Sequence, residues 1–161
     1  RRRPYQFTSE TIYDHRLRPL SYSLKEERLD KQGPQTEIVC QFILHGVKTR
    51  FSRKNQIVER FVPLAPNFVF LDNNAIHHFA VFVSQIPFEV GKKIALSIFH
   101  PRRLQNTEAT LEILRHNNLY YVLKLTTPYH QLQMWIDHHG KLVRYRQGKL
   151  MVRLVKEESS P

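Results

Sequence analysis

Apolar and polar residues alternate along most of the second half of this chain. Side chains of a strand project to opposite faces in turn, so the alternation predicts strands with one buried and one exposed face. The pattern occurs in five segments, at positions 110–114, 119–125, 131–137, 141–146 and 150–155. Tight hairpin turns are predicted between them by dipeptides that tolerate positive backbone angles, Asn117-Asn118, His139-Gly140 and Gln147-Gly148. This half is therefore predicted to form an antiparallel sheet.

The first third of the chain shows the same kind of pattern. Strands are predicted at positions 5–16, 20–29, 36–44, 47–51 and 56–62, with one more at 94–99. Short segments containing Gly, Pro or Asn separate most of them, as expected for an antiparallel sheet or barrel. Cys40 is the only cysteine, so no internal disulfide is available, and its apolar neighbours predict a small buried side chain.

The pattern changes once, between Pro66 and Pro87. Apolar residues there are spaced by three and four positions, which predicts one helix near residues 67–84 that is apolar around most of its surface. Asn67 can cap its start. Asp72 then lies in the first turns, where a carboxylate suits the positive end of the helix dipole. Because proline cannot continue a helix, Pro87 closes the segment.

These patterns together predict an α+β, mostly β fold. So many strands in one flat sheet would expose long edges. We therefore expect a strongly curved antiparallel sheet, an unclosed β-barrel of about ten to eleven strands, wrapped around the helix. The length of 161 residues fits one domain with a sizeable core. We expect this single half-barrel domain to span residues 1–161, with frayed ends at 1–4 and 156–161.

The chain is strongly basic. It has 25 Lys and Arg against 14 Asp and Glu, a formal net charge of +11 at pH 7, which attracts anionic partners. The basic residues are dispersed along the sequence, a distribution more typical of a solvated surface than of one binding groove. With 5 glycines, the chain has neither a GxGxxG nor a GxxxxGK[ST] motif, so nucleotide-driven chemistry is not expected.

No catalytic or metal-binding arrangement is visible in the sequence. The pairs His77-His78 and His138-His139 are adjacent, and adjacent side chains diverge, whereas zinc requires ligands that converge. HExxH and Gly-x-Ser-x-Gly motifs are absent, and the carboxylates fall mostly in predicted turns or on exposed strand faces. We therefore expect a protein that is not an enzyme and that uses no cofactor, metal ion or catalytic residue.

The late hairpin carries the most recognisable local motif. Residues 132–144 are similar to a "W-[IV]-D-x-x-G-x-[LIV]-x-[KR]" turn, in which Asp137 and Gly140 shape the turn and Trp135 packs. Together with the strand–helix–strand order and the apolar segment at 68–79, this hairpin resembles the LolA-like group of unclosed β-barrels. That group includes lipoprotein carriers, glycolipid-binding lipoproteins and uncharacterised DUF3108-type exported domains. The resemblance implies a concave apolar pocket for an acyl chain or similar amphiphile.

The preferred hypothesis is non-enzymatic binding of a lipid or other apolar or amphiphilic ligand in the cell envelope, as a carrier or chaperone-like protein. Each buried CH₂ contributes about 0.8 kcal/mol, so a long chain can bind without specific polar contacts. The pocket candidates are apolar residues of the helix and strands, namely Phe68, Leu71, Phe79, Phe82, Leu96, Ile98, Tyr121, Leu123, Met134 and Trp135. The candidates for holding an anionic headgroup are Arg102, Arg103, Lys124 and His78. An anionic membrane surface is a further expected partner.

Two other functions are consistent with the sequence. One is a basic β-module that binds nucleic acid or another polyanion. Its site would be a basic stripe with one aromatic ring for stacking, formed by Lys141, Arg144, Tyr145, Arg146, Lys149 and Arg153. The other is a structural or assembly domain with a filled core and a protein partner.

The cellular location is predicted from the same considerations. The sequence begins at Arg1 rather than Met, so we expect it to be truncated or processed, with room for a removed export signal or anchor. No stretch reaches the roughly 20 apolar residues of a membrane-spanning helix. The expected location is the periplasm or the cell envelope after signal removal, with the cytoplasm as the alternative.

Overall fold

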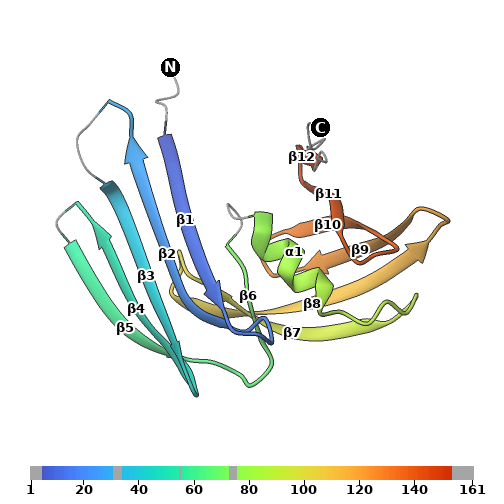
Figure 1. Ribbon diagram of the computed structural model, residues 1–161, viewed down its shortest axis with the longest axis horizontal. Coiled ribbons are helices and arrows are strands. Elements are labelled where there is room, and N and C mark those ends of the chain that lie inside the picture. Colours follow the sequence, from blue (N-terminus) through green and yellow to red (C-terminus); the bar gives the residue numbers. More distant parts are fainter. Residues whose placement is uncertain (1–4, 31–33, 55, 73–75, 154–161) are drawn as a thin grey trace. The chain divides into compact units, whose positions relative to one another are not determined.

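The computed structural model describes residues 5–30, 34–54, 56–72 and 76–153 (Figure 1). These residues form twelve β-strands and one α-helix, which confirms the mostly β character of the fold. Contacts divide the chain into two compact units. The first unit comprises Arg1–Ala75 and Phe99–Asn106, and the second comprises Ile76–Ile98 and Thr107–Pro161. The predicted frayed ends, 1–4 and 156–161, lie outside the described residues.

The first five strands form one antiparallel sheet, which we call the five-stranded sheet. Their spatial order is their order in the sequence, so each strand pairs with the next and β1 and β5 are the two edges. The bounds are β1 Tyr5–Tyr13, β2 Pro19–Arg28, β3 Pro34–Ile43, β4 Gly46–Arg53 and β5 Gln56–Pro63. All five strands belong to the first unit.

The remaining strands form the seven-stranded sheet, in the order β12-β11-β10-β9-β8-β7-β6. The bounds are β6 Phe68–Phe70, β7 Lys93–His100, β8 Gln105–His116, β9 Tyr120–Thr126, β10 Gln131–Asp137, β11 Leu142–Gln147 and β12 Leu150–Arg153. Strand β6, the last residues of β7 and the first residues of β8 belong to the first unit, and the rest of this sheet belongs to the second.

The prediction of one strongly curved sheet of about ten to eleven strands is wrong. The described strands form two sheets, neither of which is closed or strongly curled. The division follows β5, where Pro63 ends the strand and Pro66 follows three positions later. Proline has no backbone N–H to donate to a neighbouring strand, so the ladder stops there. The next strand, β6, lies in the other sheet.

The helix is shorter than the sequence pattern predicts. Helix α1 spans Ile76–Ser84, whereas part of the predicted segment, Phe68–Phe70, is strand β6. Residues 73–75 of the predicted helix lie outside the described residues. A Phe-Val-Phe triplet satisfies a period of two as well as a helical spacing, and aromatic and β-branched residues favour strands. Asp72 therefore precedes the helix and does not lie in its first turns.

No helix in the part of the chain that the structure describes has the length and apolar character needed to span a membrane.

Aromatic residues fill the core of the first unit, on one face of the five-stranded sheet. The ring of Phe70 lies 5.0 Å from that of Tyr22 and 5.1 Å from that of Phe42, measured between centroids. Phe42 also stacks on Phe68 at 5.7 Å. The backbone N of Leu71 donates to the carbonyl oxygen of Phe99 at 3.3 Å, which fixes β6 beside the end of β7. Cys40 is fully buried in this core, as the sequence predicts.

The core of the second unit lies between α1 and one face of its strands. The ring of Phe79 stacks on that of Tyr145 at 5.5 Å, and both side chains are buried. Positions that alternate along β8 to β11 point into the same core, among them Leu111, Ile113, Leu123, Leu125, Leu132 and Met134. The predicted period of two is confirmed in these strands.

The predicted late hairpin is confirmed. Strand β10 ends at Asp137, whose Oδ1 accepts hydrogen bonds from the backbone N of His139 and of Lys141, both at 2.9 Å. Gly140 has a φ of +78°, a left-handed value that favours glycine. Asp137 and Gly140 therefore shape this turn as the sequence indicates.

Candidate functional site

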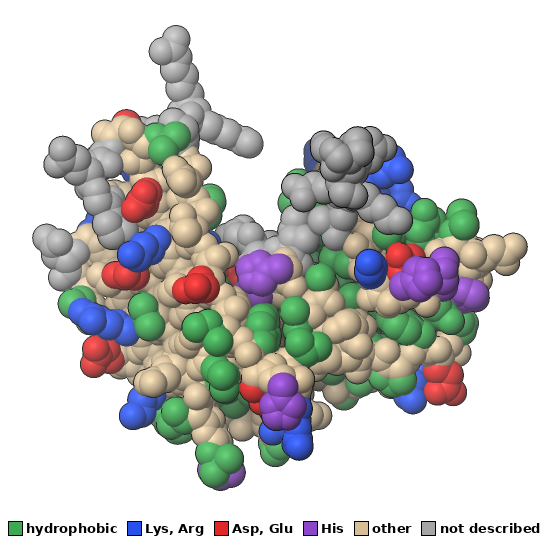
Figure 2. Space-filling view, viewed as in Figure 1, with side chains coloured by type: hydrophobic (Ala, Val, Ile, Leu, Met, Phe, Trp, Pro, Cys, Tyr) green, Lys and Arg blue, Asp and Glu red, His purple; other side chains and the backbone are tan. Residues whose placement is uncertain are grey.

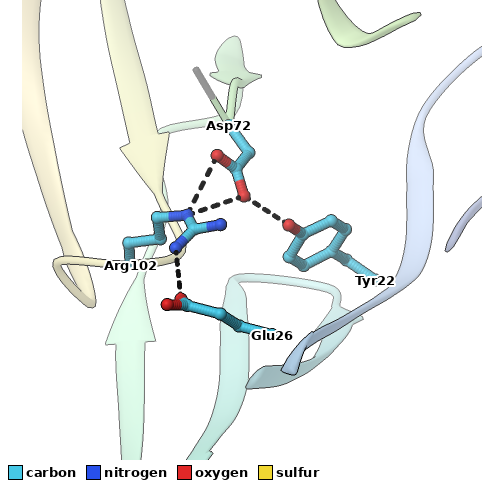
Figure 3. A network of polar contacts seen from close by, with 4 residues as sticks. All are labelled: Tyr22, Glu26, Asp72 and Arg102. Carbon is cyan, nitrogen blue, oxygen red and sulfur yellow. Dashed lines mark hydrogen bonds and ion pairs between the residues drawn. The ribbon is translucent and has the colours of Figure 1, made fainter. Parts of the chain in front are cut away.

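A carboxylate is buried in the first unit. Asp72, between β6 and α1, is 3% exposed and accepts a hydrogen bond from the hydroxyl of Tyr22 on β2 (Figure 3). The Nε of Arg102, from the turn between β7 and β8, lies 3.3 Å from each carboxylate oxygen. The Nη1 of Arg102 also lies 3.4 Å from Oε2 of Glu26 on β2. The Arg102 guanidinium lies 5.3 Å from the ring centroid of Phe7 on β1.

This polar network is suited to a structural role. Burial, followed by the Asp72 charge and hydrogen bond, raises the pKa of the Tyr22 hydroxyl, so Tyr22 stays protonated and donates. A tyrosine that acts as a general base or as a nucleophile needs a lowered pKa instead. The four groups of the network point at one another (Figure 3). They join β2 to the segment after β6 and to the turn between β7 and β8, segments that are far apart in the sequence.

The free energy of unfolding is expected to fall as the pH rises from about 9 to about 10. Burial, with a smaller effect of the Asp72 charge, raises the pKa of the Cys40 thiol to about 12 from an ordinary value of 9.0. Above pH 9 the unfolded chain loses the thiol proton while the folded chain keeps it. The stability that is present below pH 9 is therefore progressively lost, with a slope that approaches about 1.4 kcal/mol per pH unit. Urea titrations across this range measure the slope.

Cys40→Ala provides the control, because it removes the titrating group and should flatten the slope. Burial also raises the pKa of Tyr13, to about 12, and that of Tyr22. Burial raises the pKa of Tyr145 as well; the ordinary value of all three tyrosines is 10.0, so they add to the loss mainly above pH 10. An equal slope in the parent and in Cys40→Ala would mean that the buried thiol is not the cause.

The exposed face of the five-stranded sheet carries a groove of about 410 Å³, which we call the outer groove. Its volume lies within the range of about 300–1,000 Å³ that is usual for small-molecule sites. The strand register places six of its residues on this face in two rows, Gln41–Lys48–Phe61 and Val39–Arg50–Glu59. Thr49 and Arg60 line the same groove from the alternate strand positions.

Two apolar side chains are open to solvent in the outer groove. Phe61 is 56% exposed and Val39 is 40% exposed. The Phe61 ring lies over Gly46, where a Cβ would come within 2.4 Å of the Phe61 Cζ and 2.7 Å of the Val62 carbonyl oxygen. The Phe61 ring can occupy this position because glycine has no side chain. Ile57, exposed on the same face of β5, extends the apolar surface. Figure 2 shows that hydrophobic side chains reach the surface among charged ones.

Cations stand beside these apolar groups. Lys48 and Arg50 are two positions apart on β4. In the register, Lys48 pairs with Phe61 of β5 and Arg50 pairs with Val39 of β3. The Nε of Arg50 lies 3.9 Å from Oε1 of Glu59, and because both side chains are exposed this pair is weak. Within residues 5–30, 34–54, 56–72 and 76–153, Lys48 forms no ion pair. The outer groove thus combines an apolar surface with a positive charge.

The ten pocket residues predicted from the sequence fall in both compact units. Phe68 and Leu71 are in the first unit, where they pack against the aromatic core and against β7. The others are in the second unit: Phe79, Phe82, Leu96, Ile98, Tyr121, Leu123, Met134 and Trp135. Within that unit the core brings most of them together, and Phe79, Ile98, Leu123 and Met134 are fully buried. The ligand pocket itself stays a prediction.

One of these residues faces away from the others of its unit. Trp135 follows Met134 on β10, so its side chain projects from the opposite face of the sheet. The guanidinium of Arg144 lies 4.3 Å from the centroid of the Trp135 ring. Tyr121 is half-buried and stacks between Phe88 and His116, with centroids at 4.9 and 4.2 Å.

The four headgroup candidates occupy different surroundings. Arg102 belongs to the polar network of Asp72, and Arg103 is exposed in the same turn between β7 and β8. Lys124 lies on β9, opposite Glu112 of β8 and Gln133 of β10 in the register. His78 is buried on α1, with its ring 4.3 Å from that of His77. Arg102 and Arg103 belong to the first unit, and Lys124 and His78 belong to the second.

The stacking residue proposed for nucleic-acid binding is misplaced. Tyr145 is buried against Phe79, on the face opposite to Arg144 and Arg146, because adjacent strand residues face opposite sides. The aromatic ring beside Arg144 is instead that of Trp135. In the described ranges, no three His, Cys, Asp or Glu side chains gather as a metal site would require.

The outer groove and the buried carboxylate are not apparent from local patterns. A signal for the groove does exist, because β3 and β5 carry apolar residues at both even and odd positions, including Ile38 with Val39 and Phe61 with Val62. A strand that is apolar on both sides predicts a second buried or ligand-covered face. No local signal predicts the Asp72 network, whose partners lie 30 to 50 positions away along the chain.

Comparison of the chain with protein-family models, with curated proteins and with solved structures finds no match. The resemblance to the LolA-like group therefore stays a prediction.

Proposed function

We propose that the protein binds an anionic amphiphile in the outer groove of the five-stranded sheet. The observation that carries the proposal is the exposure of Phe61 and Val39 beside Lys48 and Arg50 in one groove of about 410 Å³. The class of ligand is the one expected from the sequence. The site differs, because it lies on an exposed face, whereas most of the residues predicted to line a pocket are buried in the interior.

The apolar part of the ligand would cover Phe61 and Val39. Each methylene that leaves water contributes up to about 0.8 kcal/mol, and a groove open on one side captures only part of that amount. Ile57, on the same face, lengthens the apolar track along β5. Chain length should therefore set much of the affinity.

The anionic end of the ligand would meet Lys48 and Arg50. Hydrogen bonds from a cation to a carboxylate or phosphate contribute about 1.5–3 kcal/mol net, and solvent exposure puts this groove at the low end. The exposed pair of Arg50 with Glu59 is weak enough to be displaced. Because Lys48 forms no ion pair among the described residues, no such contact has to be broken before its ammonium group binds the ligand.

Titration with dodecanoate, followed by amide NMR shifts, tests the proposal. The shifts are expected to map to β3, β4 and β5. Octanoate should bind about tenfold more weakly because it buries fewer methylenes, and uncharged dodecyl maltoside should also bind more weakly. Phe61→Ser and Lys48→Glu are each expected to raise the Kd for dodecanoate about tenfold, which corresponds to about 1.4 kcal/mol.

Two matched variants serve as controls. Leu29→Ser removes an exposed apolar side chain from the turn between β2 and β3, and Lys141→Glu reverses a charge in the second unit. Both should leave the Kd unchanged. Shifts confined to residues around α1, such as Phe79 and Met134, would refute the groove and support the interior pocket predicted from the sequence. Absence of dodecanoate binding would refute both.

A further inference from the structure

The face of the seven-stranded sheet that points away from α1 is basic. The register aligns residues of β8 to β12 on this face in two rows across the strands. One row is Arg115–Val122–Trp135–Arg144–Arg153, and the other is Glu112–Lys124–Gln133–Arg146–Met151. All of these residues belong to the second unit. We call the cations Arg115, Lys124, Arg144, Arg146 and Arg153 the basic face.

Cations outnumber carboxylates on this face in the part of the chain that the structure describes. Its two rows contain one carboxylate, Glu112, and the Nζ of Lys93 lies 3.5 Å from the Glu112 Oε1. Among the described residues, none of the five cations of the basic face forms an ion pair with a carboxylate. Arg115, Arg146 and Arg153 are exposed, and Lys124 and Arg144 are half-buried. Glu108 of β8 and Asp137 of β10 also lie at alternating positions of this face, so among its described residues positive charge outweighs negative charge.

The cations form a two-dimensional array and do not follow a single line. Neighbouring strands lie about 4.8 Å apart, so four strand intervals from β8 to β12 cover about 19 Å. Along β11 the two arginines are two positions apart, about 6.7 Å. A nucleic-acid strand is usually held in a linear groove with free aromatic rings for stacking. Here the ring of Trp135 lies under Arg144, 4.3 Å from its guanidinium, and Tyr145 faces the other side. A flat array suits a plane of anionic headgroups better.

An exposed apolar side chain accompanies the cations at one end of the face. Met151 of β12 is 52% exposed and is the register partner of Arg146. Surfaces that lie on a bilayer combine cations, which meet the headgroups, with a few apolar or aromatic groups that enter the interface. The hairpin of β11 and β12 offers that combination.

We propose that the basic face of the second unit docks onto an anionic lipid bilayer. The cations meet lipid phosphates, and Met151, near the tip of the β11–β12 hairpin, enters the interfacial region. Charge complementarity identifies the partner, because each Lys or Arg near an anionic surface strengthens binding about fivefold. This interaction is separate from amphiphile binding in the outer groove, which lies in the other unit.

Vesicle co-sedimentation tests the docking. The protein is expected to bind phosphatidylcholine vesicles that contain about one-third phosphatidylglycerol and not pure phosphatidylcholine vesicles. Binding should weaken as salt rises, because the Debye length shortens. The double variant Arg146→Gln/Arg153→Gln should lower the partition coefficient about 25-fold. Met151→Ser should lower it by a smaller factor, with an unchanged salt dependence.

The control is Arg16→Gln/Arg18→Gln, which removes the same charge from an exposed turn of the first unit. It should bind these vesicles as the parent does. Thermal unfolding of each variant separates lost docking from lost folding. The proposal is overturned if the parent fails to bind phosphatidylglycerol vesicles at low salt, or if both double variants lose binding equally. Tighter binding of a single-stranded oligonucleotide, lost in Arg146→Gln/Arg153→Gln, would also overturn it and assign the face to nucleic acid.

Discussion

Replacing Phe79 with alanine is expected to lower the free energy of unfolding by about 3–5 kcal/mol. Phe79 of α1 is fully buried, and its ring stacks on Tyr145 of β11 at 5.5 Å, the described ring contact that holds the helix on this sheet. Removing the ring leaves a cavity in a core whose other residues are held by strand pairing and cannot close around it. A urea titration of the parent and the variant measures the difference.

Phe61→Ala is the matched control, because Phe61 is a phenylalanine more than half exposed on the outer groove. Its removal should cost less than about 1 kcal/mol. Phe79 is also a predicted pocket residue, so the measurement distinguishes two roles. A loss below about 1 kcal/mol for Phe79→Ala would show that its ring borders space that water or a ligand can fill, contrary to the packing described above.

Asp72→Ala is expected to cost about 3 kcal/mol in the first unit. The change removes the acceptor of the buried Tyr22 hydroxyl and the main partner of Arg102. Breaking a buried ion pair costs about 3–5 kcal/mol, and the value here lies at the low end because solvent and Glu26 still reach Arg102. Chemical denaturation at neutral pH measures the loss.

Two further variants separate the contribution of the Tyr22 hydrogen bond from that of the Arg102 contacts. Tyr22→Phe removes one hydrogen bond and leaves the ion pair, so it should cost about 1–2 kcal/mol. Glu26→Gln removes the longer contact to Arg102, at 3.4 Å between partly exposed groups, and should cost less than about 1 kcal/mol. If Asp72→Ala destabilises the protein no more than Glu26→Gln does, the buried carboxylate does not hold these segments together.

Local patterns predict the strands well and their assembly poorly. Strand β10 spans the residues expected from alternation, 131–137, because the period of two and the turn residues Asp137 and Gly140 act within a few positions. The single curved sheet fails because the sequence does not show which strand β6 will pair with. The helix start fails because Phe68–Phe70 fits a strand and a helix equally.

The candidate site depends on contacts between distant parts of the chain. Phe61, Lys48 and Gln41 become neighbours only once β3, β4 and β5 pair in one register. The adjacent residues do not predict that Phe61 is exposed, since the next residue, Val62, is also apolar but is buried. The sequence alone predicts that Arg102 is available for a headgroup. Its pairing with Asp72 requires the β7–β8 turn to meet the segment after β6.

The single tryptophan of the chain gives the molecule a natural optical label. Trp135 lies in the second unit, under the guanidinium of Arg144, so its fluorescence reports on that unit alone. Circular dichroism follows the strands of both units. If the thermal transitions followed by Trp135 fluorescence and by circular dichroism share one midpoint, the two units unfold as one cooperative body. Two separate transitions would show that the units unfold independently.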